Sequence, residues 1–337
     1  IKNAGKNLIQ VIDDGQGMSR NDMYKSFVKH ATSKINKIDD IFSINSMGFR
    51  GEALAAISSI SMIEMYSSKL NENDGYFVEI KGGKTISEKE LIGNKGTSIK
   101  VQNLFFNVPA RRNFLKSDFV ELRHIINVFN NIALSHNEIE FSFINNGEEI
   151  FYLKKESMKK RIISIFGEKI RENLLPINED TQIANLNGFI LKPAFAKKSR
   201  SNQYIFVNNR SVKSQFINHS IFSSFDGILR DGYYPGYFLF INIDPAKIDV
   251  NVHPNKTEIK FDDDQNLYSI INSTVKHCLG IYQVSPVLDF DKDPSMDISY
   301  SQIKTNPKIP SIEIDSDFNP FQIFDDVKVK DLFSEKS

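Results

Sequence analysis

The sequence predicts an α+β protein with two folded domains, at residues 1–156 and 157–282, and a disordered tail at 283–337. Two observations support this prediction. Up to about residue 282, short apolar runs typical of strands are interspersed with amphipathic helical patterns, and beyond it the composition changes. The length of 337 residues, with 40% hydrophobic and 25% charged side chains, also agrees with more than one globular domain.

The first domain is expected to hold a sheet covered by a helix. The pattern of apolar residues predicts strands at 60–66, 76–80, 97–102, 139–145 and 149–154. A helix over 118–133 should lie across this sheet, with Asp118 and Glu121 spaced as a capping pair.

The second domain is expected to begin and end with a helix. A helix over 158–166 opens it, and a helix over about 265–279 closes it. Between them, strands are predicted at 187–192, 203–207 and 236–243.

The tail differs from the rest of the chain in charge and in proline content. Residues 283–337 hold 11 acidic and 6 basic side chains, which leaves 36 basic and 31 acidic ones before them. The net charge of zero therefore hides a tail of −5 and a folded part of +5. With five of the eleven prolines, the tail is typical of a disordered linker. Its aromatic segment 318–324 is either a partner-binding motif or a set of stray linker aromatics.

The same sequence excludes several classes of protein. A single cysteine rules out an intrachain disulfide framework and suits the cytoplasm, and the six scattered histidines show no metal-ligand spacing. No apolar run approaches the ~20 residues needed to cross a bilayer, and no secretory signal is visible. Gly82 and Gly83 imitate a phosphate-binding P-loop, but Val78 stands where its first glycine would, so we interpret them as a hairpin turn.

An acidic turn follows the first apolar run. Residues 8–12 are predicted to form a short buried strand that delivers Asp13 into an interior, and Gly15 and Gly17 follow. The Asp13 carboxylate can accept a hydrogen bond from the exocyclic amine of adenine, and the two glycines let the backbone approach the base. For the motif alone, an ordinary polar turn is the alternative interpretation.

Three further segments suit the phosphates and the base of a nucleotide. Thr32, Ser33 and Lys34 offer two hydroxyls and an amine, and the glycine-flanked segment 48–51 leads into a helix. Unpaired N–H groups and the positive end of the dipole at a helix start attract phosphate. A glycine-capped amphipathic helix is the alternative interpretation. Thr97 places a hydroxyl where a strand begins.

Taken in order, these motifs resemble those of the MutL family of DNA mismatch repair proteins. The segments are DDGQGM (13–18), HATSK (30–34), GFRGEAL (48–54), GTSIKV (96–101), FNVPARR (106–112), VNNR (207–210) and DVNVHPNK (249–256). The nucleotide motifs are shared with gyrase, heat-shock chaperone and histidine kinase ATPases, whereas GFRGEAL, NVPARR and DVNVHPNK are specific to the MutL branch. The resemblance covers residues 1 to about 282. It implies a Bergerat-type α/β sandwich ATPase domain followed by a ribosomal-S5-like α+β domain.

The resemblance also implies how the chain would bind ATP. Asp13 would bind the adenine amino group, Gly17 would shape the base pocket, and Thr97 would support that side through hydrogen bonding. Residues 32–34 would belong to a lid over the nucleotide. The phosphates would be held by Gly48, Phe49, Arg50, Gly51, Glu52, Ala53 and Leu54. Lys256 would reach from the second domain to the γ-phosphate, unless it is a surface lysine after a His-Pro turn.

Two residues that the family uses for hydrolysis are not found in this chain. In the family, the glutamate that activates water and the asparagine that helps to hold Mg²⁺ lie on a helix before the strand that begins here at Leu8, and only seven residues precede Leu8. We therefore expect an N-terminally truncated chain with little or no ATPase activity and without its own metal ligands, whereas the parent protein would use ATP and Mg²⁺. Nothing argues that Glu52 or Glu64 lies within reach of the attacking water.

Basic residues of the second domain are candidates for DNA contact. Lys197, Lys198, Arg200, Arg210 and Lys213 cluster in sequence among serine, asparagine and tyrosine residues. Such side chains commonly contact phosphates, and binding of this kind is independent of base sequence and sensitive to salt. A solvated loop is the alternative interpretation.

Together these implications describe an ATP-driven switch and DNA clamp that couples mismatch recognition by MutS to a downstream nuclease and helicase. The intact protein would form a homodimer through its N-terminal arm, whereas this chain would be monomeric. We expect a bacterial, cytoplasmic protein that associates with the nucleoid when active, without a membrane partner. Two alternatives are a gyrase-like ATPase, which lacks the NVPARR and DVNVHPNK combination, and a nucleotide-insensitive DNA-binding or docking module.

Overall fold

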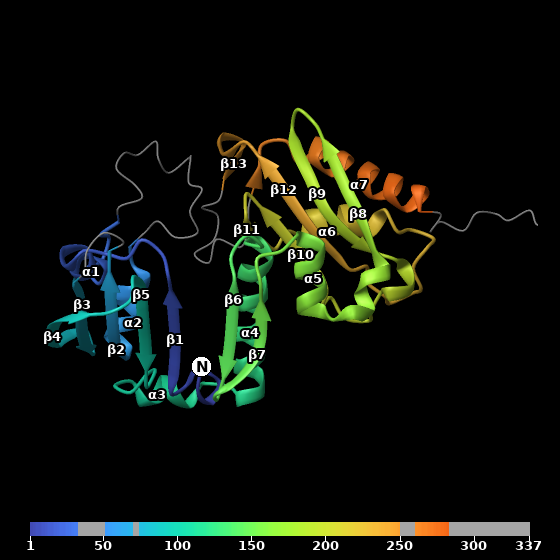
Figure 1. The fold of residues 1–337 in the computed structure, drawn as a ribbon. Helices are drawn as coiled ribbons and strands as arrows, with labels where there is room; N and C mark the ends of the chain where they lie inside the picture. The colour runs from blue at the N-terminus through green and yellow to red at the C-terminus, as the bar shows by residue number, and fades with distance from the viewer. Residues whose placement is uncertain (33–50, 70–73, 250–259, 283–337) are drawn as a thin grey trace, which may run out of the picture. The chain divides into compact units, whose positions relative to one another are not determined.

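The computed structural model describes residues 1–32, 51–69, 74–249 and 260–282 (Figure 1). These described residues belong to one compact unit. The predicted tail at 283–337 lies outside the described residues, and the domain boundary near residue 156 stays a prediction. Within the described ranges, no helix is long and apolar enough to cross a membrane.

A five-stranded antiparallel sheet forms in the first part of the chain (Figure 1). In spatial order its strands are β1 (Leu8–Asp13), β5 (Gly96–Gln102), β2 (Met62–Ser68), β3 (Asp74–Lys81) and β4 (Lys84–Ile92). Gly82 and Gly83 connect β3 to β4 with φ angles of 57° and 78°. Two successive positive φ angles are what a two-residue type I′ turn requires, so the predicted hairpin is confirmed.

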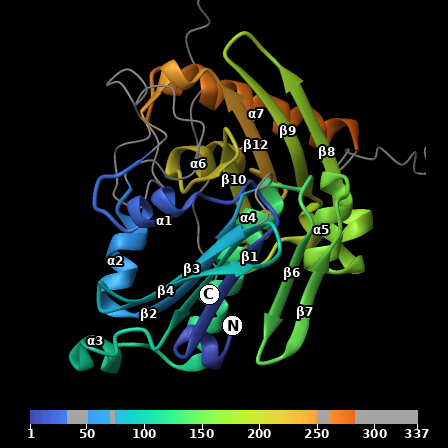
Figure 2. The same cartoon turned by 60° about the vertical axis from the view of Figure 1, so that its left-hand side comes forward.

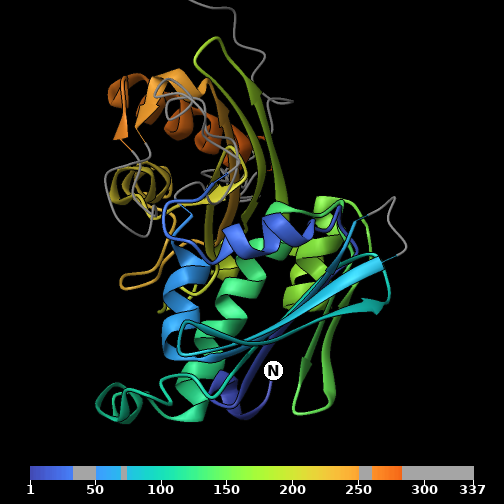
Figure 3. The ribbon, with the colours of Figure 1, turned by 90° about the vertical axis from the view of Figure 1, so that its left-hand side faces the viewer.

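Two helices pack against this sheet. They are α1 (Arg20–Ser26) and α2 (Ala53–Ile60), which lie beside the strands in Figure 3. Met23 of α1 and Ile57 of α2 contact one apolar cluster, which contains Ile63, Met65, Val78 and Ile80. These four residues alternate along β2 and β3, and this period of two assigns one face of the sheet to the core.

β1 is more exposed than the sequence predicts. It is an edge strand of the sheet, next to β5. Val11 and Ile12 are 62% and 71% exposed, and Asp13 is exposed as well. The prediction of a buried strand that delivers Asp13 into an interior is therefore wrong for the described structure. A short apolar run does not distinguish an edge strand from a central one, because both have the same local pattern.

A long helix and a hairpin follow the first sheet. After the short helix α3 (Pro109–Asn113), α4 (Asp118–Ser135) confirms the predicted helix. Its N-cap is Ser117, and Glu121 accepts a hydrogen bond from the backbone N–H of Lys116, so the predicted capping pair is wrong. Phe129 of α4 packs against the aromatic rings of Phe141, Phe143 and Phe151 in the hairpin.

The hairpin strands do not extend the first sheet, in contrast to the prediction. β6 (Phe141–Asn145) and β7 (Glu148–Leu153) form a separate two-stranded sheet. The chain reverses at Asn146 and Gly147, whose φ angles are 53° and 91°. Such a tight turn fixes the pairing of its own two strands, but it carries no information about more distant neighbours.

The second sheet is mixed and is covered on both faces (Figure 2). In spatial order its strands are β11 (Arg210–Ser211), β10 (Gln203–Val207), β12 (Tyr237–Ile243), β9 (Ala184–Leu191) and β8 (Leu174–Asp180). β10 and β12 run parallel, and the other pairs are antiparallel. The predicted strands at 187–192, 203–207 and 236–243 are confirmed, whereas β8 was not predicted.

Helices fill both sides of this sheet. α6 (Gln215–Ser223) and α7 (Asp264–Ile281) contribute to one apolar cluster, and α5 (Met158–Phe166) contributes to the other. The predicted first and last helices of this region are confirmed. Short elements complete the description: η1 (Asn3–Gly5), η3 (Glu168–Asn173), η4 (Pro193–Phe195), η5 (Pro245–Lys247), β13 (Ile248–Asp249) and β14 (Lys260–Phe261). The α+β fold class is thus confirmed.

Candidate functional site

Asp13, Thr97 and Ser67 stand in one row across three neighbouring strands. Asp13 of β1 lies opposite Thr97 of β5, and Thr97 lies opposite Ser67 of β2. Residues opposite each other in antiparallel strands project to the same face, with Cβ atoms about 4.5–5.5 Å apart. The sheet therefore brings together two predicted base-contacting residues, which are 84 positions apart in sequence, and adds a third polar residue.

The hydroxyls of Ser67 and Thr97 form a buried pair. Ser67 is fully buried and Thr97 is 8% exposed, and their hydroxyl oxygens lie 3.0 Å apart. The Ser67 oxygen also accepts a hydrogen bond of 2.8 Å from the backbone N–H of Met18. A further contact of 3.2 Å joins it to the carbonyl oxygen of Gly96. The Ser67 hydroxyl thus connects Met18, at the end of the acidic turn, with Gly96 and Thr97 at the start of β5.

Ser67 was not predicted as a site residue. The only local signal is that β2 alternates buried and less buried positions and ends with two serines, Ser67 and Ser68. A serine at the buried end of a strand is common, and its partner Thr97 becomes visible only through the pairing of β2 with β5.

Two glycines fix the acidic turn against neighbouring strands. Gly17 has a φ of 65°, and a Cβ atom there would lie 1.9 Å from the carbonyl oxygen of Ser68. Gly96 has a φ of 104°, and its Cβ would lie 2.0 Å from the carbonyl oxygen of Asp13. No side chain fits at either place, so these glycines are required by close backbone contact within the protein.

The carboxylate of Asp13 is held by its own turn and remains accessible. One of its oxygens accepts a hydrogen bond of 3.0 Å from the backbone N–H of Gly15. This contact orients the side chain, while the exposure of Asp13 leaves acceptor capacity for a ligand amine. Gly15 serves here as a donor in the turn rather than as a position that requires positive φ.

The segment before residue 32 meets the start of α2. Gly51 has a φ of 62°, and a Cβ there would lie 2.0 Å from the carbonyl oxygen of Ala31. Next to this contact, Nδ1 of His30 lies 3.0 Å from Oε1 of Glu52. The two motifs that were assigned to the lid and to the phosphates are therefore neighbours. Thr32 follows Ala31 directly and is the last residue of the described range 1–32.

The start of α2 offers backbone donors for an anion. Glu52 is the N-cap residue, and its side chain makes no capping hydrogen bond. The first N–H groups of a helix have no partner within the helix, and here they belong to Ala53, Leu54 and their neighbours. Of the other predicted contacts, Ser33, Lys34, Gly48, Phe49, Arg50 and Lys256 lie outside the described residues.

The described part of the chain was compared with the ligand sets that proteins use for metal ions. Its residues include no group of three or more histidine, cysteine, aspartate or glutamate side chains that could hold a metal ion. We assign no step to Mg²⁺.

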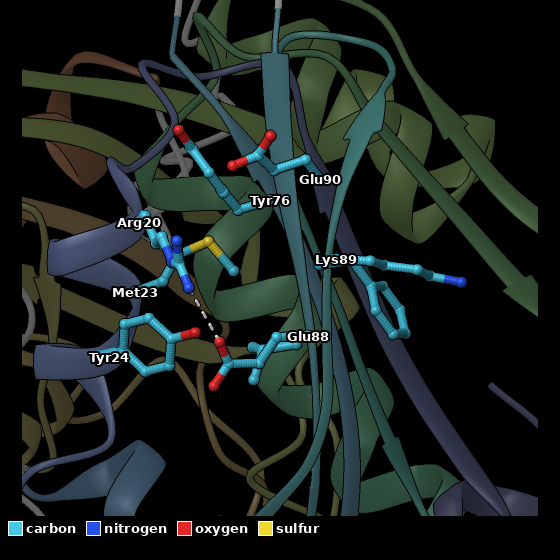
Figure 4. Close-up of a pocket in the computed structure, with 9 residues that line it drawn as sticks. Arg20, Met23, Tyr24, Tyr76, Glu88, Lys89 and Glu90 are labelled. Carbon is cyan, nitrogen blue, oxygen red and sulfur yellow. Dashed lines mark hydrogen bonds and ion pairs between the residues drawn. The ribbon is translucent and has the colours of Figure 1, made fainter.

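A separate cavity lies between α1 and the hairpin of β3 and β4 (Figure 4). Its volume is about 310 Å³, and none of the predicted nucleotide contacts lines it. Arg20 approaches Glu88 to 3.2 Å across its wall. A hydrogen bond from Tyr24 and the charge of Arg20 hold the pKa of Glu88 below its ordinary value. The charges of Arg20 and Glu88 in this wall thus compensate one another.

Part of the predicted DNA-contacting set forms one cluster. Lys197 and Tyr234 exchange two backbone hydrogen bonds, of 3.1 Å and 2.8 Å, which join the loop before β10 to the loop before β12. The guanidinium of Arg200 lies 4.7 Å from the ring centre of Tyr234, and the Lys198 ammonium lies 5.9 Å from that of Tyr233. These cation–π contacts position the exposed side chains of Lys198 and Arg200 beside the two loops that the Lys197–Tyr234 hydrogen bonds join.

The other two basic residues lie apart from this cluster along the sheet. Arg210 pairs with Val207 at the far end of β10, roughly 14 Å along the strand from Gln203. It is 9% exposed, and burial lowers the pKa of its guanidinium. Lys213 follows β11 and is exposed. The structure therefore joins Lys197, Lys198 and Arg200 but not Arg210.

Comparison with known proteins shows one consistent family. A family model described as "DNA mismatch repair protein, C-terminal domain" matches residues 162–280. The DNA mismatch repair protein MutL of Christiangramia forsetii is 50% identical over 322 residues, which are 96% of this chain and 52% of that protein. MutL of Flavobacterium psychrophilum is 51% identical over 321 residues, with coverage of 95% and 52%. The chain thus spans about half the length of these curated relatives.

Solved structures share the fold. A crystal structure of the N-terminal domain of a DNA repair protein aligns with a TM-score of 0.71 and 24% identity, and the alignment covers 85% of this chain and 89% of that one. The Aquifex aeolicus MutL ATPase domain complexed with ADP aligns with a TM-score of 0.54 and 24% identity, with coverage of 71% and 81%. From its close similarity to the curated relatives, we conclude that the chain belongs to the MutL family of DNA mismatch repair proteins.

Proposed function

We propose that the chain is the nucleotide-binding part of a DNA mismatch repair factor and that adenine binds at the row formed by Asp13, Thr97 and Ser67. This row is the observation that carries the proposal. It combines an exposed carboxylate with a nearly buried hydroxyl on one sheet face. A carboxylate accepts from the exocyclic amine of adenine, and a hydroxyl can donate to a ring nitrogen beside it.

The phosphates would lie toward the start of α2. The contact between Ala31 and Gly51 brings the backbone before residue 32 to the N-terminal end of this helix. Helix N–H groups and the helix dipole favour a polyphosphate there. We assign the remaining contacts to residues 33–34 and 48–50 and the γ-phosphate contact to Lys256, as the family resemblance implies. The ADP in the Aquifex aeolicus neighbour supports a nucleotide as the ligand.

The test is calorimetric titration of the chain with a non-hydrolysable ATP analogue, since there is no tryptophan to report binding. We expect binding in the original chain and its loss in Asp13→Asn, which keeps the size of the side chain but presents an amide. Absence of binding by a folded original chain would contradict the proposal.

The cluster of Lys197, Lys198 and Arg200 would contact DNA through phosphates. Its support is the paired loop backbone and the cation–π contacts that orient the basic groups outward. Contacts of this kind read no base sequence, which suits a factor that acts at mismatches in any context. Lys213 is an additional exposed candidate, and Arg210 would support the strand pair from within.

In the whole protein, nucleotide binding would drive a conformational switch. We propose that the closed state clamps DNA as a homodimer and couples the mismatch-recognition protein MutS to a downstream nuclease and helicase in the bacterial cytoplasm. DNA retention that depends on ATP would support the switch. Retention that is indifferent to ATP would favour a nucleotide-insensitive binding module instead. A gyrase-like ATPase is not favoured, because the curated relatives are mismatch repair proteins.

A further inference from the structure

The cavity between α1 and the hairpin of β3 and β4 has an apolar and aromatic lining. Met23 of α1 and Val78 of β3, each 2% exposed, are among its lining residues, together with the rings of Tyr24 and Tyr76 (Figure 4). Its volume of about 310 Å³ is at the lower end of the range for ligand pockets, which is ~300–1,000 Å³. A space of this size suits one long side chain better than a large cofactor.

The cavity already holds one guanidinium. Nη2 of Arg20 donates a hydrogen bond of 3.2 Å to the carboxylate of Glu88. The hydroxyl of Tyr24 hydrogen-bonds to both of these side chains. A carboxylate and a tyrosine therefore hold the cation of Arg20 at one end of the cavity.

A second pair of a carboxylate and a tyrosine lies at the other end. Glu90 follows Glu88 by two residues on β4 and stands opposite Tyr76 of β3, so both side chains project to the cavity face of the hairpin. Figure 4 shows the Tyr76 hydroxyl and the Glu90 carboxylate together, away from Glu88 and Tyr24. Neither side chain makes a hydrogen bond or ion pair with another described residue. This pair thus repeats the chemistry that holds Arg20, but without a cation.

The charges around the cavity favour a positive ligand. Lys89 lies between the two glutamates in sequence, but its side chain projects to the opposite face, where its ammonium lies 4.9 Å from the ring centre of Phe77. Since Arg20 compensates Glu88, the carboxylate of Glu90 leaves one negative charge in the cavity lining. A carboxylate attracts a cation and repels an anion.

We propose that this cavity binds the guanidinium of an arginine side chain from a partner polypeptide, at Tyr76 and Glu90. A guanidinium can donate two parallel hydrogen bonds to a carboxylate and can stack on a tyrosine ring. The apolar stem of the arginine would lie against Met23 and Val78, which are the buried apolar residues of the lining. The site is independent of the proposed nucleotide site, because none of the nucleotide contacts lines this cavity.

The experiment follows the methyl group of Met23 by NMR in the full chain. The seven methionines are labelled in their methyl groups, and Met23→Leu assigns the reporter signal. The probe is a blocked pentapeptide with one arginine between glycines. We expect a saturable shift of the Met23 signal on titration, because this side chain lines the cavity.

Two further peptides test which feature of the arginine is recognised. Citrulline has the shape of arginine but no charge, and the citrulline peptide should bind about tenfold more weakly, because it loses a charge-assisted hydrogen bond. The lysine peptide should also bind more weakly than the arginine peptide, because an ammonium is a point charge that cannot donate two parallel hydrogen bonds or stack on a ring.

Glu90→Gln tests the proposed contact, and Glu79→Gln is its matched control. Glu90→Gln should weaken the arginine peptide about tenfold. Glu79→Gln removes the same charge from the same hairpin, but Glu79 lies on the opposite face, where its carboxylate accepts a hydrogen bond of 3.1 Å from Ser87. It should leave the affinity unchanged. Because Glu90 is exposed, Glu90→Gln should fold and melt like the original chain.

Four outcomes would overturn the inference. If the arginine peptide does not shift the Met23 signal, the cavity is not a binding site for this side chain. Equal binding of the citrulline or the lysine peptide would show that the guanidinium is not what is recognised. Equal weakening by Glu90→Gln and Glu79→Gln would reduce the effect to the general charge of the hairpin. Free arginine that binds ten times more tightly than the peptide would make the amino acid the ligand in place of a partner polypeptide.

Discussion

Nη1 of Arg161 in α5 donates a hydrogen bond of 2.7 Å to the backbone carbonyl of Ala133 in α4. The Arg161 side chain is fully buried. The same guanidinium also donates to the carbonyl oxygens of His136, Asn137, Ile139 and Lys154. The last carbonyls of a helix have no partner within the helix, and here one buried side chain satisfies the end of α4 and the loop beyond it.

Arg161→Met should strongly destabilise the protein. It keeps an unbranched apolar stem but removes the donor from the buried carbonyl of Ala133 and from the partly buried carbonyls of Ile139 and Lys154. It also leaves the Glu156 carboxylate, 3.3 Å from Nε, without its partner. We expect a loss of about 3–5 kcal/mol in the free energy of unfolding, measured by chemical denaturation. Arg171→Met is the matched control, because Arg171 is exposed and pairs only with the nearby Glu168 among its described contacts. A similar loss in both variants would show that the carbonyl contacts contribute little.

Gly17→Ala should disturb the candidate nucleotide site. Its Cβ would lie 1.9 Å from the carbonyl oxygen of Ser68, so the acidic turn must move away from β2. Gly147→Ala has a similar positive φ of 91° but no atom within 4 Å, and it should cost only the ~1–2 kcal/mol of an unfavourable φ. We expect Gly17→Ala to cost at least ~1 kcal/mol more than the control by denaturation. It should also weaken binding of the ATP analogue, whereas Gly147→Ala should not.

Charge reversal at the basic cluster should weaken DNA retention. The triple variant of Lys197, Lys198 and Arg200 to glutamate removes up to three phosphate contacts. The slope of log affinity against log salt should then fall by up to ~3 in magnitude on duplex DNA. Reversal of the exposed lysines Lys155, Lys159 and Lys160 changes the net charge equally and should have a smaller effect. Equal effects of the two triples in filter retention at several salt concentrations would remove the cluster from the DNA-contacting surface.

The sequence predicted helices and strands best where the hydrophobic pattern of a segment matches the burial of its side chains in the fold. The strand at 203–207 and the helix at 158–166 were predicted with the bounds that the structure has. The strand is a short continuous apolar run that is buried on both faces, and the helix has a clear amphipathic period. β8 was missed because Leu174–Asp180 contains a proline and two acidic residues, and its place beside β9 comes from long-range pairing. α6 was missed because its run of polar and β-branched residues has modest helix propensity.

The candidate site could be predicted only in part for a similar reason. Asp13 and Thr97 stand out because glycines and a strand boundary mark each of them in the sequence. Ser67 has no such mark, and its contact with Thr97 depends on the register between β2 and β5. Likewise, the separation of Arg210 from Arg200 follows from the direction of β10, which their closeness in sequence conceals.

Cys278 should stay protonated and slow to react at alkaline pH in the folded protein. Its thiol is 5% exposed and donates a hydrogen bond of 3.3 Å to the carbonyl oxygen of Pro176. Burial raises the pKa of this thiol to about 11. At pH 9 only roughly one thiol in a hundred is then ionised, whereas most thiols in the unfolded chain are. Alkylation by iodoacetamide at pH 9 should therefore be much slower than in denaturant, and equal rates would contradict this burial.

The same raised pKa gives the stability a pH dependence of known sign. Between the unfolded thiol pKa near 8.5 and the folded value of about 11, the folded state binds more protons than the unfolded state. The contribution of Cys278 to stability is thus fully present below pH ~8.5 and is lost as pH rises toward the folded pKa. Cys278→Ala lacks this group, so its unfolding free energy should fall less steeply from pH 8.5 to 10.5 than that of the original chain. Identical slopes in denaturant titrations across this range would show that the thiol does not titrate differently in the two states.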